Sequence, residues 1–219
     1  MGATPAFGPS LEKPVKLYYS PGACSRASHI VLEESGIAYE TVRVNLRDKR
    51  TADGKDFLTI NPKGYVPALQ LGDGEVLTEN TALLPYLGEL VASTGLMPPA
   101  GSFENYRVRE WLGFINGELH KNCSPLFRPN VPEAVAQQAR DNLNRRLTYT
   151  NEKLGAGPFL LGDQLTVADA YLFVVLGWLP KLKVDTGAWP NLNAFFQRMN
   201  QRPAVQKVLR DEEQAAKAA

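Results

Sequence analysis

Cys24 is the residue whose type and position are best suited to chemistry. It follows a short apolar segment and a Pro21-Gly22 turn, at the start of a helix-like segment that ends at Gly36. The N–H groups at a helix start carry partial positive charge and favour thiolate over thiol, so this position predicts a Cys24 pKa below the ordinary value of about 8.5. A free cysteine can also be an inert, buried apolar residue. The turn and the helix start favour the reactive interpretation.

A second cysteine is missing from the Cys24 segment. Position 27 is Ala27, where a Cys-x-x-Cys motif would have its other sulfur, so a disulfide formed at Cys24 needs a thiol from outside the motif to resolve it. Cys123 is the only other cysteine of the chain, and it is either a second redox thiol or a passive residue at a helix end. Two widely spaced cysteines do not form a disulfide framework, which predicts a reducing, cytoplasmic setting.

Glu79, Asn80 and His120 are further candidates. Glu79 and Asn80 begin a helix-like segment. The N–H groups of a helix start bind carboxylates and Glu79 can pair with an amino group, so the two residues suit a zwitterionic ligand. Asn80 can also be explained as a helix N-cap. His120 lies beside the apolar stripe of its own helix, near the small and polar residues Gly113 and Asn116, so it either borders a cleft or faces solvent.

The elements that position these residues change character along the chain. Strand-like and helix-like segments alternate over residues 15–92, and Gly72-Asp73-Gly74 separates the two arms of a predicted hairpin. After a turn-rich linker at 93–103, the apolar periodicity over 104–219 is helical, with a capping-box signature from Thr166 to Asp169. We therefore predict an α/β domain followed by an all-α domain, preceded by a flexible extension at 1–14.

Composition excludes several classes of function. The 219 residues include 24 basic and 23 acidic side chains, a net charge of +1, so there is no electrostatic case for nucleic acid or for an anionic membrane. No apolar run approaches the roughly 18 residues of a membrane-spanning helix. No metal site is predicted.

Four motifs carry a resemblance to one family. The segment from Ser20 to Ser25, Ser-Pro-Gly-Ala-Cys-Ser, resembles the signature before the first helix of the bacterial beta-class glutathione S-transferases. The runs 61–69, 77–82 and 118–121 resemble that family's loop before the third strand, its glutathione-carboxylate site and its contribution from the second domain. The resemblance extends from about Lys16 to Leu209. It implies the glutathione transferase fold, a thioredoxin-like N-terminal domain plus an all-α C-terminal domain, and a homodimer.

The resemblance also implies the site. Glutathione would be the co-substrate, without a further cofactor, and a hydrophobic electrophile the second substrate. Cys24 and His120 would be the catalytic residues at the glutathione sulfur. The Val66–Pro67 bond would be cis, which leaves the backbone of Val66 free to pair with an extended peptide. The residues implied to bind the tripeptide are Cys24, Lys49, Tyr65, Val66, Pro67, Glu79, Asn80 and His120.

Several alternatives remain open. Tyr19 and Ser25 resemble the activating residues of other transferase classes, although core packing and helix capping also explain them. Arg26 stands where the family usually has an apolar residue, and it either adds positive charge near Cys24 or lies on the surface. Thiol-disulfide exchange through a mixed disulfide at Cys24 can accompany conjugation. A glutathione-dependent dehalogenase or thioltransferase would share the same site, and a non-catalytic ligand-binding or interaction module could share the fold.

Overall fold

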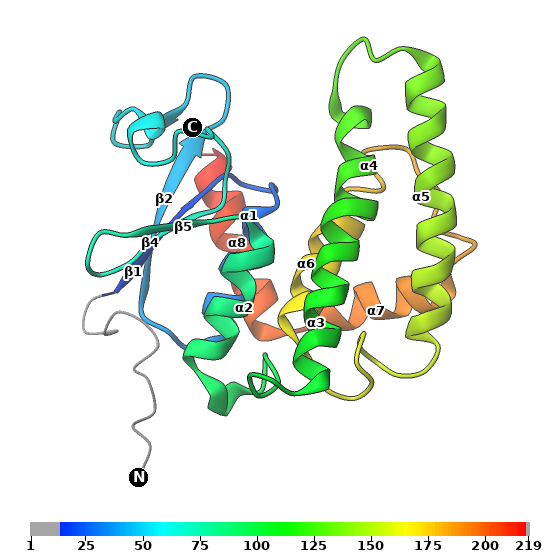
Figure 1. Cartoon of the computed structure of the whole chain (residues 1–219). Coiled ribbons are helices and arrows are strands. Elements are labelled where there is room, and N and C mark those ends of the chain that lie inside the picture. Colours follow the sequence, from blue (N-terminus) through cyan, green and yellow to red (C-terminus); the bar gives the residue numbers. More distant parts are fainter. Residues whose placement is uncertain (1–13, 218–219) are drawn as a thin grey trace.

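A five-stranded mixed sheet forms the first half of the computed structural model, which describes residues 14–217 (Figure 1). The predicted extension at 1–14 therefore lies outside the described residues except for Pro14. The strand order is β3-β2-β1-β4-β5, in which β1 pairs parallel with β2 and antiparallel with β4. The strands are β1 (Val15–Tyr19), β2 (Tyr39–Asn45), β3 (Arg50–Thr51), β4 (Ala68–Gln70) and β5 (Val76–Thr78). The predicted hairpin is confirmed as β4 and β5.

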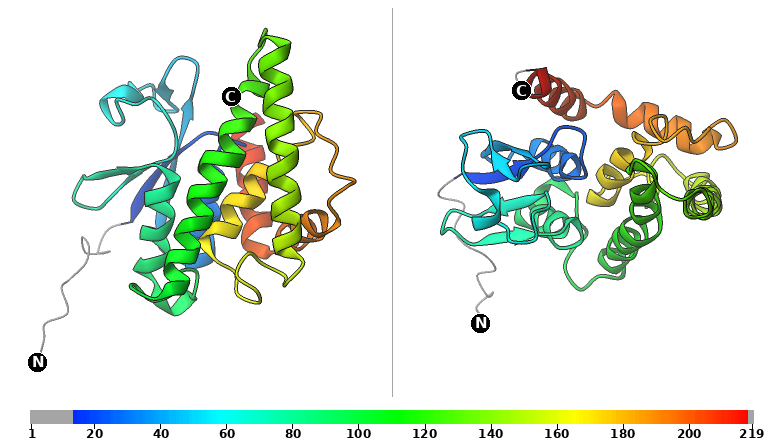
Figure 2. Two further views of the ribbon diagram at one scale, coloured as in Figure 1. Left: turned by 45° about the vertical axis from the view of Figure 1, so that its right-hand side comes forward. Right: turned by 90° about the horizontal axis from the view of Figure 1, so that it is seen from above.

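Two helices, α1 (Ser25–Ser35) and α2 (Asn80–Leu90), pack against each other and lie between the sheet and the second half (Figure 2). Helix α1 ends at Gly36, whose φ of 69° is the left-handed conformation that glycine adopts without steric cost. The boundaries predicted for this helix are confirmed. Helix α2 continues through the buried Pro85, which has no N–H to donate to the preceding turn. A short 3-10 helix at Phe57–Thr59 contributes Phe57 to a smaller cluster with Tyr18 and Val44.

The second half is helical throughout, as the change in periodicity predicts (Figures 1 and 2). The helix that begins as α3 passes through a π-helical turn before it ends, and this turn carries His120. The helical segments are η2 (Ala92–Thr94), α3 (Phe103–Phe114), the π-helical turn η3 (Ile115–His120), α4 (Lys121–Cys123), η4 (Ser124–Phe127), α5 (Glu133–Leu154), α6 (Val167–Leu176), α7 (Pro190–Asn200) and α8 (Pro203–Lys217).

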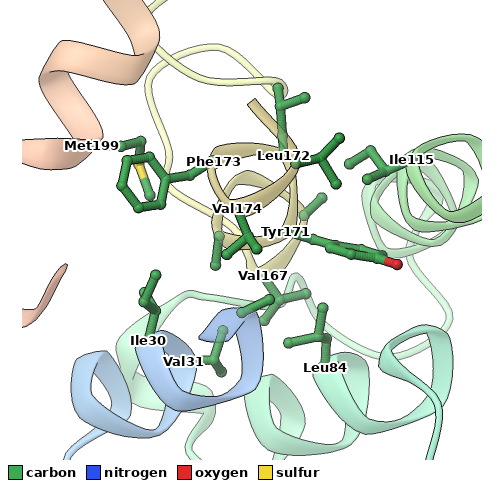
Figure 3. Close-up of a cluster of buried hydrophobic side chains, with 14 of the residues drawn as sticks. Ile30, Val31, Leu84, Ile115, Val167, Tyr171, Leu172, Phe173, Val174 and Met199 are labelled. Atoms are coloured by element: carbon green, nitrogen blue, oxygen red, sulfur yellow. The ribbon is translucent and has the colours of Figure 1, made fainter. Parts of the chain in front are cut away.

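Helix α6 is the centre of the core. Its ten residues are all buried, and Figure 3 shows its side chains among residues of α1, α2, η3 and α7, which are Ile30, Val31, Leu84, Ile115 and Met199. The predicted capping box begins this helix. Thr166 donates its hydroxyl to Asp169 at 2.8 Å, and the same carboxylate accepts the Thr166 N–H at 2.8 Å. In α5 the residues at three- and four-residue spacing are likewise buried, in agreement with the helical periodicity predicted over 104–219; they are Ala139, Leu143, Leu147, Thr150 and Leu154. Within residues 14–217, no helix combines the length and apolar character needed to cross a membrane.

Candidate active site

A cavity of about 810 Å³ collects side chains from both halves of the molecule. All eight residues of the predicted site line it, although they come from segments between positions 24 and 120. The helical half contributes six further residues, which are Asn116, Lys121, Ser124, Phe127, Tyr171 and Trp178. The cavity therefore combines charged groups, a thiol, an imidazole and apolar rings.

The loop after β1 places Cys24 at the edge of this cavity. Gly22 turns the loop with a φ of 74°, and Cys24 is the residue directly before α1. Ser25 closes the loop because its hydroxyl accepts the Ser20 N–H at 3.1 Å and donates to the Ser20 carbonyl at 3.4 Å. Ser25 is fully buried and does not line the cavity, so its hydroxyl serves the loop.

The thiol of Cys24 is partly buried at the edge of this cavity. It donates to the Val66 carbonyl across 3.2 Å. Burial raises the Cys24 pKa to about 12, and the Glu79 charge raises it further, although the backbone N–H groups of Cys24 and Ser25 lower it. The predicted pKa below 8.5 is therefore wrong for the protein without a ligand. The helix start acts in the expected direction, but the loss of water around the sulfur outweighs it.

Asn80 has a different local role from the one predicted. Glu79 occupies the N-cap position of α2, and Asn80 is the first helical residue. The Asn80 side chain donates to the Cys24 carbonyl at 3.0 Å and accepts from the Ser28 hydroxyl at 2.8 Å. It thereby joins the starts of α1 and α2. The backbone N–H groups at the start of a helix have no acceptor within that helix and face outward from its end.

Glu79 combines an exposed carboxylate with a strained backbone. Its φ of 72° and ψ of 122° lie outside the regions that non-glycine residues prefer, a cost of about 1–3 kcal/mol. Its side chain is 57% exposed and pairs with Lys63, with 2.9 Å between the Lys63 Nζ and the Glu79 Oε1. This strained backbone conformation places the exposed Glu79 carboxylate at the cavity, beside the start of α2.

Lys49 and the loop before β4 form another part of the cavity wall. The Lys49 ammonium donates to the Gly64 carbonyl at 2.9 Å and lies 5.7 Å from the centre of the exposed Tyr65 ring. The buried Asn61 orders this loop, since its amide donates to the Tyr65 carbonyl at 2.7 Å. The Val66–Pro67 bond is cis, in agreement with the expectation.

His120 lines the cavity and does not face solvent as a surface residue would. Its Nδ1 lies 2.7 Å from the hydroxyl oxygen of Tyr171, and its ring centre lies 4.8 Å from that of Trp178. Burial lowers the His120 pKa to about 4, and the nearby Lys121 charge lowers it as well. The imidazole is therefore neutral at pH 7 and can accept a proton.

Glu212, in the last helix α8, accepts hydrogen bonds that hold the loop carrying Cys24. This fully buried carboxylate accepts the Gly22 N–H at 2.8 Å and the Arg26 Nε–H at 2.8 Å, and lies 3.3 Å from His29 Nδ1. Arg26 is thus an ion-pair partner of Glu212 rather than a free charge beside Cys24 or a solvated surface residue. His29 is structural, as its position inside the first helix predicts.

Tyr171 and Trp178 line the cavity and Glu212 holds its loop, although the motifs did not indicate any of the three. The Trp178 indole donates to the Gly22 carbonyl at 2.9 Å, so Gly22 is held by Trp178 and Glu212 together. Glu212 had a signal in the sequence: with Val205 and Val208 it forms the buried face of α8, where a carboxylate is out of place. No comparable signal distinguishes Tyr171 and Trp178 from ordinary core aromatics.

The alternative nucleophiles and activators lie outside the cavity. The Tyr19 ring packs 5.5 Å from His29, and the residue lines a separate surface hollow near Tyr39. Cys123 is fully buried, and burial raises its pKa to about 12. Cys24 is therefore the only cysteine at the cavity.

Comparison with known proteins identifies the relatives of this architecture. Residues 22–90 match the family model described as "Glutathione S-transferase, N-terminal domain", and residues 114–203 match "Glutathione S-transferase, C-terminal domain". The chain is 46% identical over 195 residues to glutathione S-transferase GstA of Escherichia coli O157:H7, an alignment that covers 89% of this chain and 97% of the relative.

Two solved structures are similar over nearly their whole length. A sphingomonad glutathione S-transferase complexed with glutathione has a TM-score of 0.88 and 41% identity, and the match covers 90% of this chain and 98% of that one. The bacterial beta-class glutathione S-transferase of Sphingomonas chungbukensis has a TM-score of 0.87 and 42% identity over the same shares of the two chains.

Proposed function

This chain belongs to the glutathione S-transferase family, and we propose that it conjugates glutathione to hydrophobic electrophiles in the cavity lined by Cys24 and His120. It is an enzyme of the bacterial beta class with the glutathione transferase fold, and glutathione is its co-substrate. The proposal rests on one observation: a single cavity is lined by the Cys24 thiol, the neutral His120 imidazole, the Glu79 carboxylate and the Lys49 ammonium.

The charges around the cavity match those of glutathione. The γ-glutamyl end carries an amino group and a carboxylate, and we assign the amino group to Glu79 and the carboxylate to the free N–H groups at the start of α2. Lys49 can pair with the carboxylate at the other end of the tripeptide. The Val66 carbonyl can accept a backbone N–H from the middle of the extended tripeptide, in the way that a neighbouring β-strand would. Tyr65 and Pro67 lie on either side of Val66 at this contact.

The sulfur of a ligand bound in this way would lie between Cys24 and His120. The neutral imidazole can accept the thiol proton, which leaves a glutathione thiolate to attack the electrophile. The apolar wall formed by Phe127 and Trp178, whose ring centres are 5.6 Å apart, supports a hydrophobic second substrate.

Cys24 supports a second reaction, thiol-disulfide exchange. Its thiolate would attack one sulfur of oxidised glutathione, the S–S bond would break, and one glutathione thiolate would leave while the other half stays bonded to Cys24. A second glutathione thiolate would then attack the glutathione sulfur of the adduct, form oxidised glutathione and release the Cys24 thiolate, so net exchange requires a different substrate disulfide in the first step. Dehalogenase or thioltransferase specialisation would use the same residues with a different second substrate. A non-catalytic binding module has no need of both Cys24 and the γ-glutamyl site at Glu79 and Asn80.

We also propose a homodimer and a cytoplasmic location. Phe103 and Tyr106 leave more than half of their surface exposed at the start of α3, which suits contact with a second copy. Both cysteines are free thiols, which suits a reducing compartment.

Glu79→Gln is expected to weaken glutathione binding by about 1–3 kcal/mol, or roughly 5- to 150-fold in Kd, because the variant loses a charged partner of the α-amino group. Calorimetric titration with reduced glutathione measures this effect. Glu75→Gln is the matched control, since Glu75 is an exposed carboxylate on the neighbouring hairpin and does not line the cavity. Equal affinities for the two variants would remove Glu79 from the glutathione site.

A further inference from the structure

The buried hydroxyl of Tyr171 joins His120 to Asn116. Tyr171 projects from α6, and Figure 3 shows its hydroxyl on the side of the helix that carries Ile115. The Tyr171 oxygen lies 2.7 Å from His120 Nδ1, and the hydroxyl donates to the Asn116 Oδ1 across 3.1 Å. The Tyr171 residue is 1% exposed, yet all three residues line the active-site cavity.

The direction of these hydrogen bonds determines which histidine nitrogen carries the proton. A hydroxyl has a single hydrogen, and an amide oxygen can only accept. With the Asn116 amide oxygen facing Tyr171, as in this structure, the hydroxyl gives its hydrogen to Asn116 and its oxygen accepts from the ring. His120 must then carry its proton on Nδ1, and its Nε2 is left with a free lone pair. Among the described residues, Nε2 has no hydrogen-bond partner.

We propose that Tyr171 is a positioning residue that holds His120 in its Nδ1–H tautomer, so that Nε2 is the atom that takes the proton of the glutathione thiol. This inference rests on the proposed function, in which His120 acts at the glutathione sulfur. Tyr171 does not touch the reacting atoms and acts only through His120.

The proton transfer balances without any further reactant. The S–H bond of glutathione breaks and an Nε2–H bond forms, which leaves a thiolate and an imidazolium. The Nδ1–H of the imidazolium keeps its hydrogen bond to the Tyr171 oxygen, and that bond becomes stronger once the ring is charged. The opposite tautomer would present an N–H to the thiol and could not accept its proton. Burial keeps the free ring neutral at pH 7, so the Nε2 lone pair is available; the same burial disfavours the imidazolium, which the thiolate formed beside it stabilises as an ion pair.

Nitrogen NMR of the imidazole rings tests the tautomer directly. The chain has two histidines, so a His120→Asn spectrum assigns the signals, and His29 serves as an internal reference. We expect wild-type His120 to show a protonated Nδ1 and an unprotonated Nε2. Tyr171→Phe should shift the ring toward the Nε2–H tautomer. Asn116→Ala should shift the ring in the same direction, because the Tyr171 hydroxyl is then free to donate to Nδ1. Asn116 is exposed, so this variant should fold normally.

Kinetics separate positioning from a structural role. Tyr171→Phe should lower kcat about 3- to 10-fold, the range for one lost hydrogen bond, with the KM for glutathione unchanged. Tyr149→Phe, on the exposed side of α5, is the control and should leave kcat unchanged. In a His120→Asn background, Tyr171→Phe should have no further effect on kcat.

The outcomes distinguish this inference from the proposed function. An Nε2–H tautomer in the wild type, unchanged ring signals in Tyr171→Phe, or an equal kcat loss in the His120→Asn background would overturn the role of Tyr171 alone. Full activity of His120→Asn would instead overturn the proposed role of His120, and the role of Tyr171 with it.

Discussion

Glu212→Ala is expected to lower the free energy of unfolding by about 3–5 kcal/mol, the cost of removing one partner from a buried ion pair. The Arg26 guanidinium and the Gly22 N–H would both lose their acceptor. For a chain of this length the loss corresponds to a fall in Tm of about 6–20 °C. Because Gly22 belongs to the loop that carries Cys24, activity should also fall at temperatures where the variant is still folded.

Glu213→Ala is the matched control for this prediction. Glu213 is the next residue of α8, but its side chain is 65% exposed and pairs only with Lys217. Exposed helix pairs of this kind contribute little to stability, because water and salt screen the two charges. Thermal unfolding of the two variants side by side therefore isolates the buried position. A similar fall in Tm for both would show that the Glu212 cluster does not support the fold.

The second large effect concerns the pH dependence of Cys24. Because its pKa is raised to about 12, the thiolate fraction of the ligand-free protein should increase about tenfold per pH unit from pH 7 to 10. Alkylation by iodoacetamide should accelerate by the same factor, roughly a thousandfold in total. The buried Cys123 should remain unmodified over this range.

A small free thiol measured alongside provides the reference. Its alkylation rate should level off above its ordinary pKa of about 8.5, whereas the rate for Cys24 keeps rising. A Cys24 rate that levels off below pH 8 would mean that the helix start lowers the pKa after all, and that burial does not dominate. Cys24→Ser and Cys123→Ser variants identify which thiol reacts.

Local signals in the sequence were sufficient for the fold. The limits of α1, the β4–β5 hairpin and the capping box of α6 were all predicted, because turn glycines, alternation and capping residues act over a few neighbouring positions. The eight site residues implied by the family motifs all line one cavity in the structure.

Features that depend on distant packing could not be predicted. Burial raises the Cys24 pKa, and this burial comes from the folded chain rather than from the neighbouring residues. The helix start considered alone therefore predicts a lowered pKa, which is the wrong direction. The Asn80 side chain bonds to Cys24 and Ser28 on another helix, which no N-cap preference reveals. The contacts of Glu212 with Arg26 and Gly22 span 186 and 190 positions.

The most direct test of the glutathione site is the reaction of the protein with oxidised glutathione at about pH 9, followed by intact-mass spectrometry and peptide mapping. We expect one glutathione adduct per chain, on Cys24, that reductant removes and that is present in Cys123→Ser and absent in Cys24→Ser. S-methylglutathione, which can occupy the site but cannot exchange, should protect Cys24. An adduct on Cys123, or the absence of protection by S-methylglutathione, would contradict the assignment of this cavity to glutathione.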